Sequence, residues 1–146
     1  MTRTIVVGYD DQEPARRALE EAVEKAKQSD AKLLIVAVAE MALDPSTPRN
    51  FGTLGAGRAP VELPEPPDIT RAFENARELV ASHELSADYV WAPGEPASVL
   101  VGIAKRNDAE LIVIGDHHHG FFSRLFGASI TPSVRREAGC DVLVVS

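Results

Sequence analysis

Seven consecutive apolar residues at 33–39 (LLIVAVA) restrict the fold of this chain more than any other segment does. A strand with one face in water alternates apolar and polar side chains, and this run does not alternate. Uninterrupted apolar runs are typical of parallel sheets, because helices cover both faces of such sheets. We therefore predict a strand buried on both faces.

Four other short runs also predict strands, at 4–9, 87–91, 111–114 and 142–145. Between the strands, apolar residues recur at helical spacing. Pro14 suits the first turn of the first helix, where its missing N–H costs nothing, and Asp68 is a candidate N-cap of the second. The predicted inward positions of the first three helices are Ala15, Ala18, Leu19, Ala22, Val23 and Ala26; Ile69, Ala72, Phe73, Ala76, Leu79 and Val80; and Val99, Leu100, Ile103 and Ala104. A last helix is predicted around Ile130, Val134 and Ala138.

Strands joined through helices run parallel, with right-handed crossovers. The alternation therefore predicts an α/β fold, an open doubly wound five-stranded parallel sheet with helices on both faces, in one domain over residues 1–146. Ligands of such sheets bind beyond the carboxyl ends of the strands, near the point where the strand order reverses. The segments to consider are thus 9–11, 38–40, 91–94 and 115 onward.

Residues 41–67 form a different kind of segment, rich in proline and glycine and without helical or strand periodicity. This composition predicts a long surface loop. Two roles are open for it: an insertion without function, or a lid or arm that reaches a site or a partner.

The net charge of −7 argues against nucleic acid and anionic membranes as partners, because no basic patch offsets it. Backbone amides can still bind an anionic small ligand. The single cysteine, Cys140, excludes an internal disulfide and is expected to fill space beside a strand. Without a signal peptide or an apolar stretch of about 20 residues, we expect a cytoplasmic protein with no membrane partner.

Three segments carry a resemblance to a known family: IVVGYD before an alanine-rich helix, Gly94-Glu95-Pro96 before another helix, and ELIVIG, a loop, a helix and CDVLVV at the C-terminus. In this order the chain resembles the universal stress proteins over nearly its whole length, except the loop at 41–67. The resemblance implies a Rossmann-like sheet of the adenine-nucleotide α-hydrolase type. It also implies a homodimer formed through the C-terminal strand at 142–145, and exposed edge strands do pair readily with another chain.

The resemblance also implies binding residues. In the ATP-binding branch the last loop reads G-x2-G-x9-G-[ST], and this chain has the same spacing with two of the three glycines replaced. A nucleotide would then meet Asp10 near its adenosine part and Val38 near its adenine. Its phosphates would meet the last loop and the start of the following helix, at Gly115, His118, Ala128, Ser129 and Thr131. The implied cofactor is ATP or another adenine nucleotide, with Mg²⁺ as a possible companion.

Other interpretations of the loop after Gly115 remain open. A branch of the family that does not bind ATP has a histidine-rich, aromatic loop similar to DHHHGFFSRLF here. The histidines of 116–119 are expected to be a polar loop and not a metal site, because consecutive residues rarely converge on one ion. The apolar residues of the loop either pack onto the sheet edge or contact a partner; they are Phe121, Phe122, Leu125 and Phe126.

No catalytic triad, nucleophile elbow or G-x4-G-K-[ST] loop is present in the sequence, so no catalytic residue is predicted. The resemblance therefore implies a stress-response regulatory module that binds an adenine nucleotide and has a regulatory protein as partner. The alternatives are a stress protein that acts through dimer and partner surfaces without a nucleotide, and a weak ATP hydrolase.

Overall fold

The computed structural model describes residues 3–39, 64–115, 137 and 139–145. In this part of the chain five strands form one parallel sheet in the order β3-β2-β1-β4-β5. The strands are β1 (Thr4–Gly8), β2 (Lys32–Ala39), β3 (Ala87–Pro93), β4 (Leu111–Gly115) and β5 (Asp141–Val145). The predicted α/β fold with five parallel strands is confirmed.

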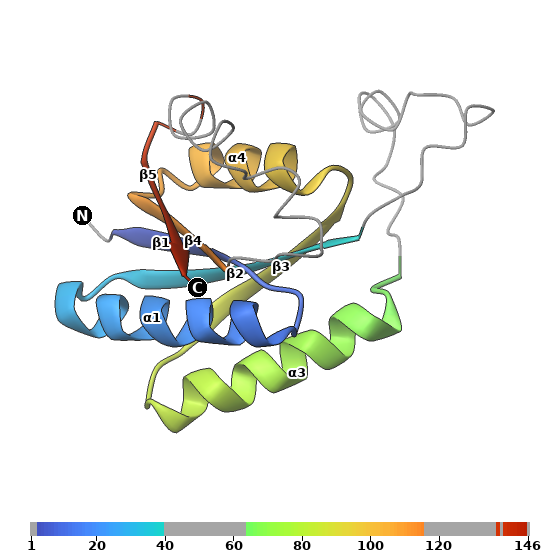
Figure 1. Ribbon diagram of the computed structural model, residues 1–146, viewed down its shortest axis with the longest axis horizontal. Helices are drawn as coiled ribbons and strands as arrows, with labels where there is room; N and C mark the ends of the chain where they lie inside the picture. The colour runs from blue at the N-terminus through green and yellow to red at the C-terminus, as the bar shows by residue number, and fades with distance from the viewer. Residues whose placement is uncertain (1–2, 40–63, 116–136, 138, 146) are drawn as a thin grey trace.

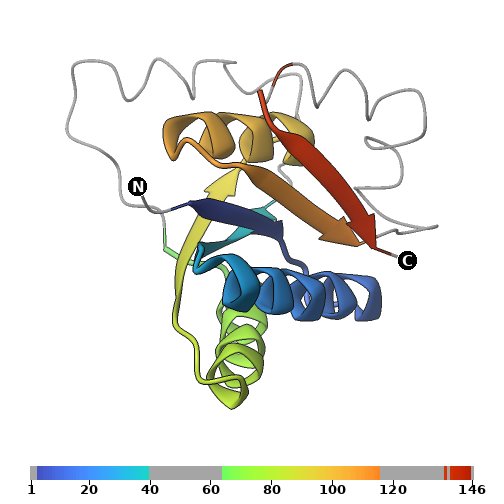
Figure 2. The same cartoon turned by 90° about the vertical axis from the view of Figure 1, so that its left-hand side faces the viewer.

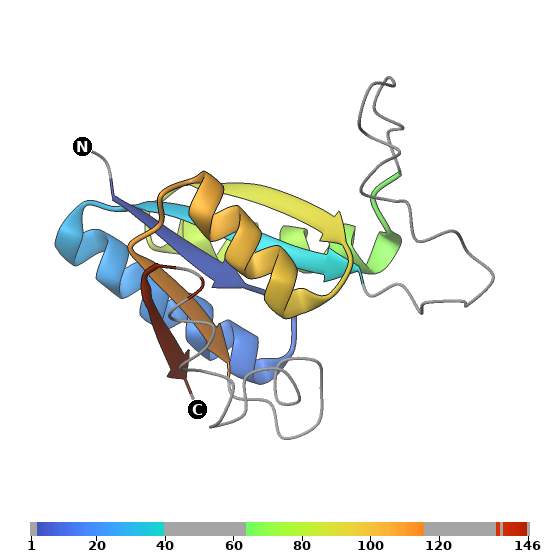
Figure 3. The ribbon, with the colours of Figure 1, turned by 90° about the horizontal axis from the view of Figure 1, so that it is seen from above.

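Helices cover both faces of the sheet, as predicted. Figure 1 shows α1 (Glu13–Ser29) and α3 (Pro67–Ser82) below the sheet and α4 (Pro96–Arg106) above it. The turned view of Figure 2 shows the same layers, with β5 beside β4 at one edge. Seen from above, α4 lies over β1 and β2, which it contacts (Figure 3).

The core consists of two apolar clusters separated by the sheet, and consecutive strand residues alternate between them. Ile5 and Val7 of β1 face α1 and α3, whereas Val6 faces α4. All three are almost fully buried. This explains why the strand sequences do not alternate: both faces are dry, so each position needs an apolar side chain.

The helical stripes follow the predicted spacing. Every predicted inward residue of α1 is buried, and only Leu79 of α3 and Val99 of α4 are partly exposed. Burying six apolar side chains along α1 supplies much more stabilisation than the intrinsic helix propensity of its sequence.

The predicted start of α3 was wrong. The helix begins at Pro67 with Pro66 as its N-cap, and Asp68 lies in the first turn without a capping hydrogen bond. Proline fits this turn because the first amides have no helical partner, and an acid there still interacts favourably with the helix dipole. Position 67 of the predicted loop therefore belongs to the helix, and 41–63 lie outside the described residues.

β5 forms one edge of the described sheet and β3 the other, so the prediction of an edge strand at 142–145 is confirmed. The helix predicted around Ile130, Val134 and Ala138 and the aromatic group at 121–126 lie outside the described residues. None of the helices in the described ranges combines the length and the apolar character that a membrane crossing requires.

Candidate functional site

The strand order reverses between β1 and β4. From β1 the chain builds outward to β2 and β3, and it then crosses over to β4 and β5 on the other side of β1. The point between β1 and β4 is therefore the switch point of the strand order, which is where doubly wound sheets bind ligands. The residues that follow β1 and β4 define the candidate site.

Asp10 and Asp11 form the turn from β1 into α1. The backbone N–H of Gln12 donates to Oδ1 of Asp10 at 3.1 Å, so Asp10 holds the turn through its own side chain. Asp11 has a φ of 64°, in the left-handed region that aspartate tolerates better than most residues do. The turn thus presents Asp10 at the carboxyl end of the central strand.

The carboxylate of Asp11 accepts hydrogen bonds from three residues, two of which lie on different helices. The hydroxyl of Tyr9 donates to Oδ1 at 2.9 Å, and the guanidinium of Arg16 on α1 donates to the same oxygen at 3.3 Å. The amide of Asn75 on α3 donates to Oδ2 at 2.8 Å.

Tyr9 is 2% exposed and lies where β1 ends. Burial is the main reason why the pKa of its phenol lies well above the ordinary value, and the hydrogen bond to Asp11 raises that pKa further. Tyr9 therefore remains a protonated donor to Asp11 at physiological pH.

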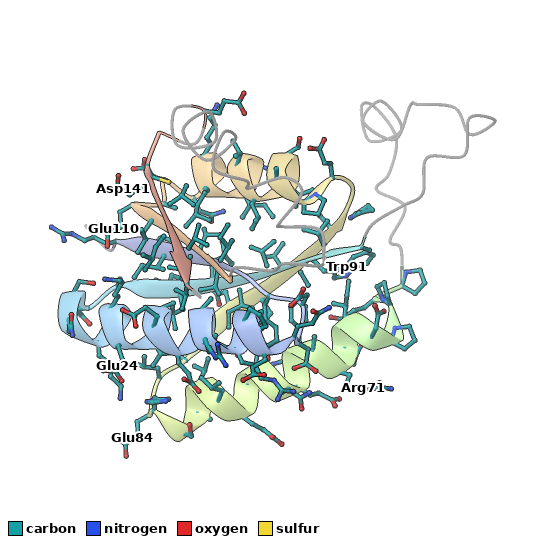
Figure 4. The ribbon with its side chains drawn as sticks, viewed as in Figure 1. Glu24, Arg71, Glu84, Trp91, Glu110 and Asp141 are labelled. Carbon is teal, nitrogen blue, oxygen red and sulfur yellow. The ribbon has the colours of Figure 1, made fainter. Side chains whose placement is uncertain are left out.

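A hydrogen bond joins the ends of β2 and β3, at the same edge of the sheet as the turn from β1 into α1. Val38 is opposite Ala92 in the strand register and packs against the cluster under α4. The N–H of Gly94 donates to the carbonyl of Ala39 at 3.1 Å, and its φ of 136° requires glycine. Figure 4 shows Trp91 at this end of the sheet, far from Glu110 and Asp141 at the opposite end.

Gly115 ends β4 directly against the first turn of α1. A Cβ added there would lie 2.4 Å from the carbonyl carbon of Pro14 and 2.8 Å from the nitrogen of Ala15. The glycine is needed because two main chains approach each other, and this requirement exists without any ligand. The expected phosphate contact of Gly115 stays a prediction.

The structure brings Asp10 and Gly115 to the same corner, because both border the start of α1, while Val38 lies one strand further along the sheet. The other predicted binding residues, His118, Ala128, Ser129 and Thr131, lie outside the described residues, as does the histidine loop. Among the described residues, no group of three or more histidine, cysteine or acidic side chains could hold a metal ion.

Sequence reasoning missed two members of the Asp11 network. Asn75 lies 64 residues from Asp11, and a single polar residue on the inner side of a helix gives no local signal of its partner. Arg16 lies among acidic side chains in the sequence, which gives no signal that it pairs with Asp11. Asp11 itself was the better sequence signal of a turn at this position, since aspartate is one of the few residues that adopt the left-handed conformation readily.

The comparisons with known proteins agree with the α/β fold described above. The family model described as the universal stress protein family matches residues 1–146. The universal stress protein YxiE of Bacillus subtilis (strain 168) is 27% identical over 153 residues, covering 99% of each chain.

Two solved structures match over nearly the full length. A universal stress protein in complex with cAMP is 27% identical, covers 99% of this chain and 97% of its own, and gives a TM-score of 0.67. The universal stress protein from Archaeoglobus fulgidus in complex with dAMP is 17% identical, with a TM-score of 0.63 and coverage of 100% and 98%. The second similarity supports the fold alone.

Proposed function

The chain belongs to the universal stress protein family, and on that premise we propose that it is a cytoplasmic regulatory module that binds an adenine nucleotide. The nucleotide would lie across the carboxyl ends of β1, β2 and β4. The observation that carries the proposal is the 27% identical relative that was crystallised with cAMP, whose chain matches this one almost end to end.

The described residues suit such a ligand. Asp10 offers carboxylate acceptors for ribose hydroxyls or for an adenine amino group, and it lies at the strand-order reversal. Val38, half-buried near the end of β2, offers an apolar contact for a flat base. By resemblance, the phosphates would meet Gly115, His118, Ala128, Ser129 and Thr131.

Binding can be tested by thermal unfolding of the purified protein with cAMP, AMP or ATP, each with and without Mg²⁺. A ligand of the folded state alone stabilises it by about 2.7 kcal/mol at a hundredfold excess over its dissociation constant. A rise in the midpoint with at least one nucleotide is expected. If none of the three ligands raises the midpoint at millimolar concentration, nucleotide binding is refuted.

Two aspartates provide a matched pair of variants. Asp10→Asn keeps the oxygen that accepts from Gln12 but removes the charge, and we expect affinity to fall roughly tenfold, as for a lost charged hydrogen bond. Asp141→Asn makes the same change at the far end of the sheet and should leave affinity unchanged (Figure 4). Equal affinities in both variants would remove Asp10 from the site.

We propose binding rather than catalysis as the role of the site. Purified protein should therefore release no phosphate from ATP above the background of an Asp10→Asn preparation. Magnesium-dependent turnover that disappears in this variant would point to the weak hydrolase instead.

We also propose a homodimer formed through β5, with a regulatory protein as a further partner. Support comes from the place of β5 at one edge of the described sheet and from Val144, which is 38% exposed. An exposed apolar edge strand pairs readily with a second copy. Light scattering should give twice the monomer mass, and Val144→Lys should give the monomer; a monomeric wild type would contradict the dimer.

A further inference from the structure

We propose that Asp11 is a positioning residue of the nucleotide site, which it serves by fixing the backbone turn that carries Asp10. Asp11 would not touch the nucleotide. This inference rests on the proposed function, because it assigns Asp11 a part in binding at that same site.

The backbone of Asp11 is the first argument. With a φ of 64° the residue occupies a region that glycine enters without cost and that other residues enter with strain. A turn that needed only this conformation would be served better by glycine. Aspartate tolerates this conformation better than most residues do, and its side chain here makes contacts that glycine could not make.

The second argument is where the side chain reaches. Its two oxygens join Tyr9 at the end of β1, Arg16 on α1 and Asn75 on α3. Tyr9 and Arg16 lie close to Asp11 in the sequence, whereas Asn75 comes from another helix, so the three contacts hold Asp11 against both α1 and α3. The Asn75 contact also links the turn to α3, which is distant in sequence.

The third argument is the link from Asp11 to Asp10. Asp11 lies between Asp10 and Gln12, and the N–H of Gln12 holds Oδ1 of Asp10. The φ of Asp11 therefore determines where the Gln12 N–H points and, through it, where the Asp10 carboxylate is held. A site whose ligand group is fixed before binding loses less entropy on binding, which increases affinity.

The decisive variant is Asp11→Gly, which permits the same backbone conformation but removes all three contacts. We expect nucleotide affinity to fall roughly tenfold, since preorganisation is lost. The urea midpoint of Asp11→Gly should also fall, because relief of backbone strain offsets only part of the three lost hydrogen bonds, so the comparison at constant stability comes from the half-exposed Arg16 contact. Hydrogen exchange at the Gln12 amide should become faster, which would report a turn that is no longer fixed.

Arg16 and Arg17 provide a matched control. Both lie on α1, their side chains are 52% and 53% exposed, and each pairs with one acid, Asp11 for Arg16 and Glu13 for Arg17. Arg16→Gln should weaken nucleotide binding and speed exchange at Gln12, whereas Arg17→Gln should do neither. Asn75→Ala tests the third contact and should behave like Arg16→Gln. These variants keep the test open if Asp11→Gly does not fold.

The outcomes separate the two proposals. If the wild type binds no adenine nucleotide, the proposed function fails and this inference fails with it. If the wild type binds but Asp11→Gly, Arg16→Gln and Asn75→Ala bind equally well, only the positioning role is refuted. Weaker binding of Arg16→Gln with an unchanged urea midpoint supports it, because a purely structural contact would lower stability and affinity together.

Discussion

Gly115→Ala adds one methyl group where β4 meets the start of α1. Its Cβ would lie 2.4 Å from the carbonyl carbon and 2.5 Å from the carbonyl oxygen of Pro14. The ordinary van der Waals separation of such atoms is at least about 3.5 Å. The strand end and the helix would thus have to separate by roughly 1 Å, and neither main chain can rotate away as a side chain could.

The expected cost is about 3 kcal/mol, at the upper end of the range for overpacked cores. The displaced helix carries six buried side chains on its inner face, so a shift of its first turn disturbs packing along that face. With a urea slope of about 1.5–2 kcal/mol/M, the unfolding midpoint should fall by about 1.5–2 M. The melting temperature should fall by about 6–12 °C.

Gly102→Ala is the matched control, because it is the same substitution inside α4. The nearest atom to its added Cβ is a side-chain nitrogen of Arg106 at 3.7 Å, an ordinary contact. Alanine in a helix interior should stabilise by about 0.4–1 kcal/mol. If Gly115→Ala unfolds within about 0.5 kcal/mol of wild type while Gly102→Ala behaves as expected, the close packing of α1 against β4 is refuted.

Three further predictions concern the core, the turn and the thiol. Leu19→Ala empties a fully buried position on α1 and should cost about 2–5 kcal/mol by urea unfolding, whereas a cost below about 1 kcal/mol would contradict the packing. Burial raises the pKa of Tyr9 above its unfolded value of about 10, so its contribution to stability is complete below pH 10 and is lost above it. Stability should therefore fall by about 1.4 kcal/mol more per pH unit above pH 10 in wild type than in Tyr9→Phe, and parallel curves would refute this. Burial, with Asp141 adding to it, raises the pKa of the Cys140 thiol, so Ellman's reagent at pH 8 should react more slowly with it than with glutathione; an equal rate would contradict this.

The sequence predicted most of the fold because burial on two faces leaves a simple pattern. The run 33–39 contains no polar residue, and the structure buries 33–37 between the cluster under α1 and α3 on one side and α4 on the other. The apolar stripe of α1 could be predicted equally well, because its apolar residues at helical spacing are the ones that are buried. The order of the strands in the sheet could not be predicted, because no local sequence pattern indicates that Val6 pairs with Ile112.

The candidate site was predicted less completely, and the reasons are physical. Asp10 could be predicted as a site residue because it directly follows a strand. The role of Asp11 depends on its backbone φ and on its contact with Asn75, a residue that only tertiary packing brings close to it. The phosphate contact expected for Gly115 stays a prediction, and the structure adds a close approach to the main chain of Pro14 that no sequence pattern indicated. A sequence shows that glycine is present but not which neighbour requires it.

The central place of β1 has a consequence for synthesis on the ribosome. Val6 pairs with Leu34 on one side and with Ile112 on the other. The first neighbour emerges early, but the second follows after a delay of roughly 4–16 seconds at about 5–20 residues per second. During that interval the nascent chain can complete β1, β2 and β3 with α1 and α3, while the second edge of β1 has no neighbouring strand until β4 is synthesised. The segment from Leu111 onward, which carries β4 and β5, therefore completes the sheet.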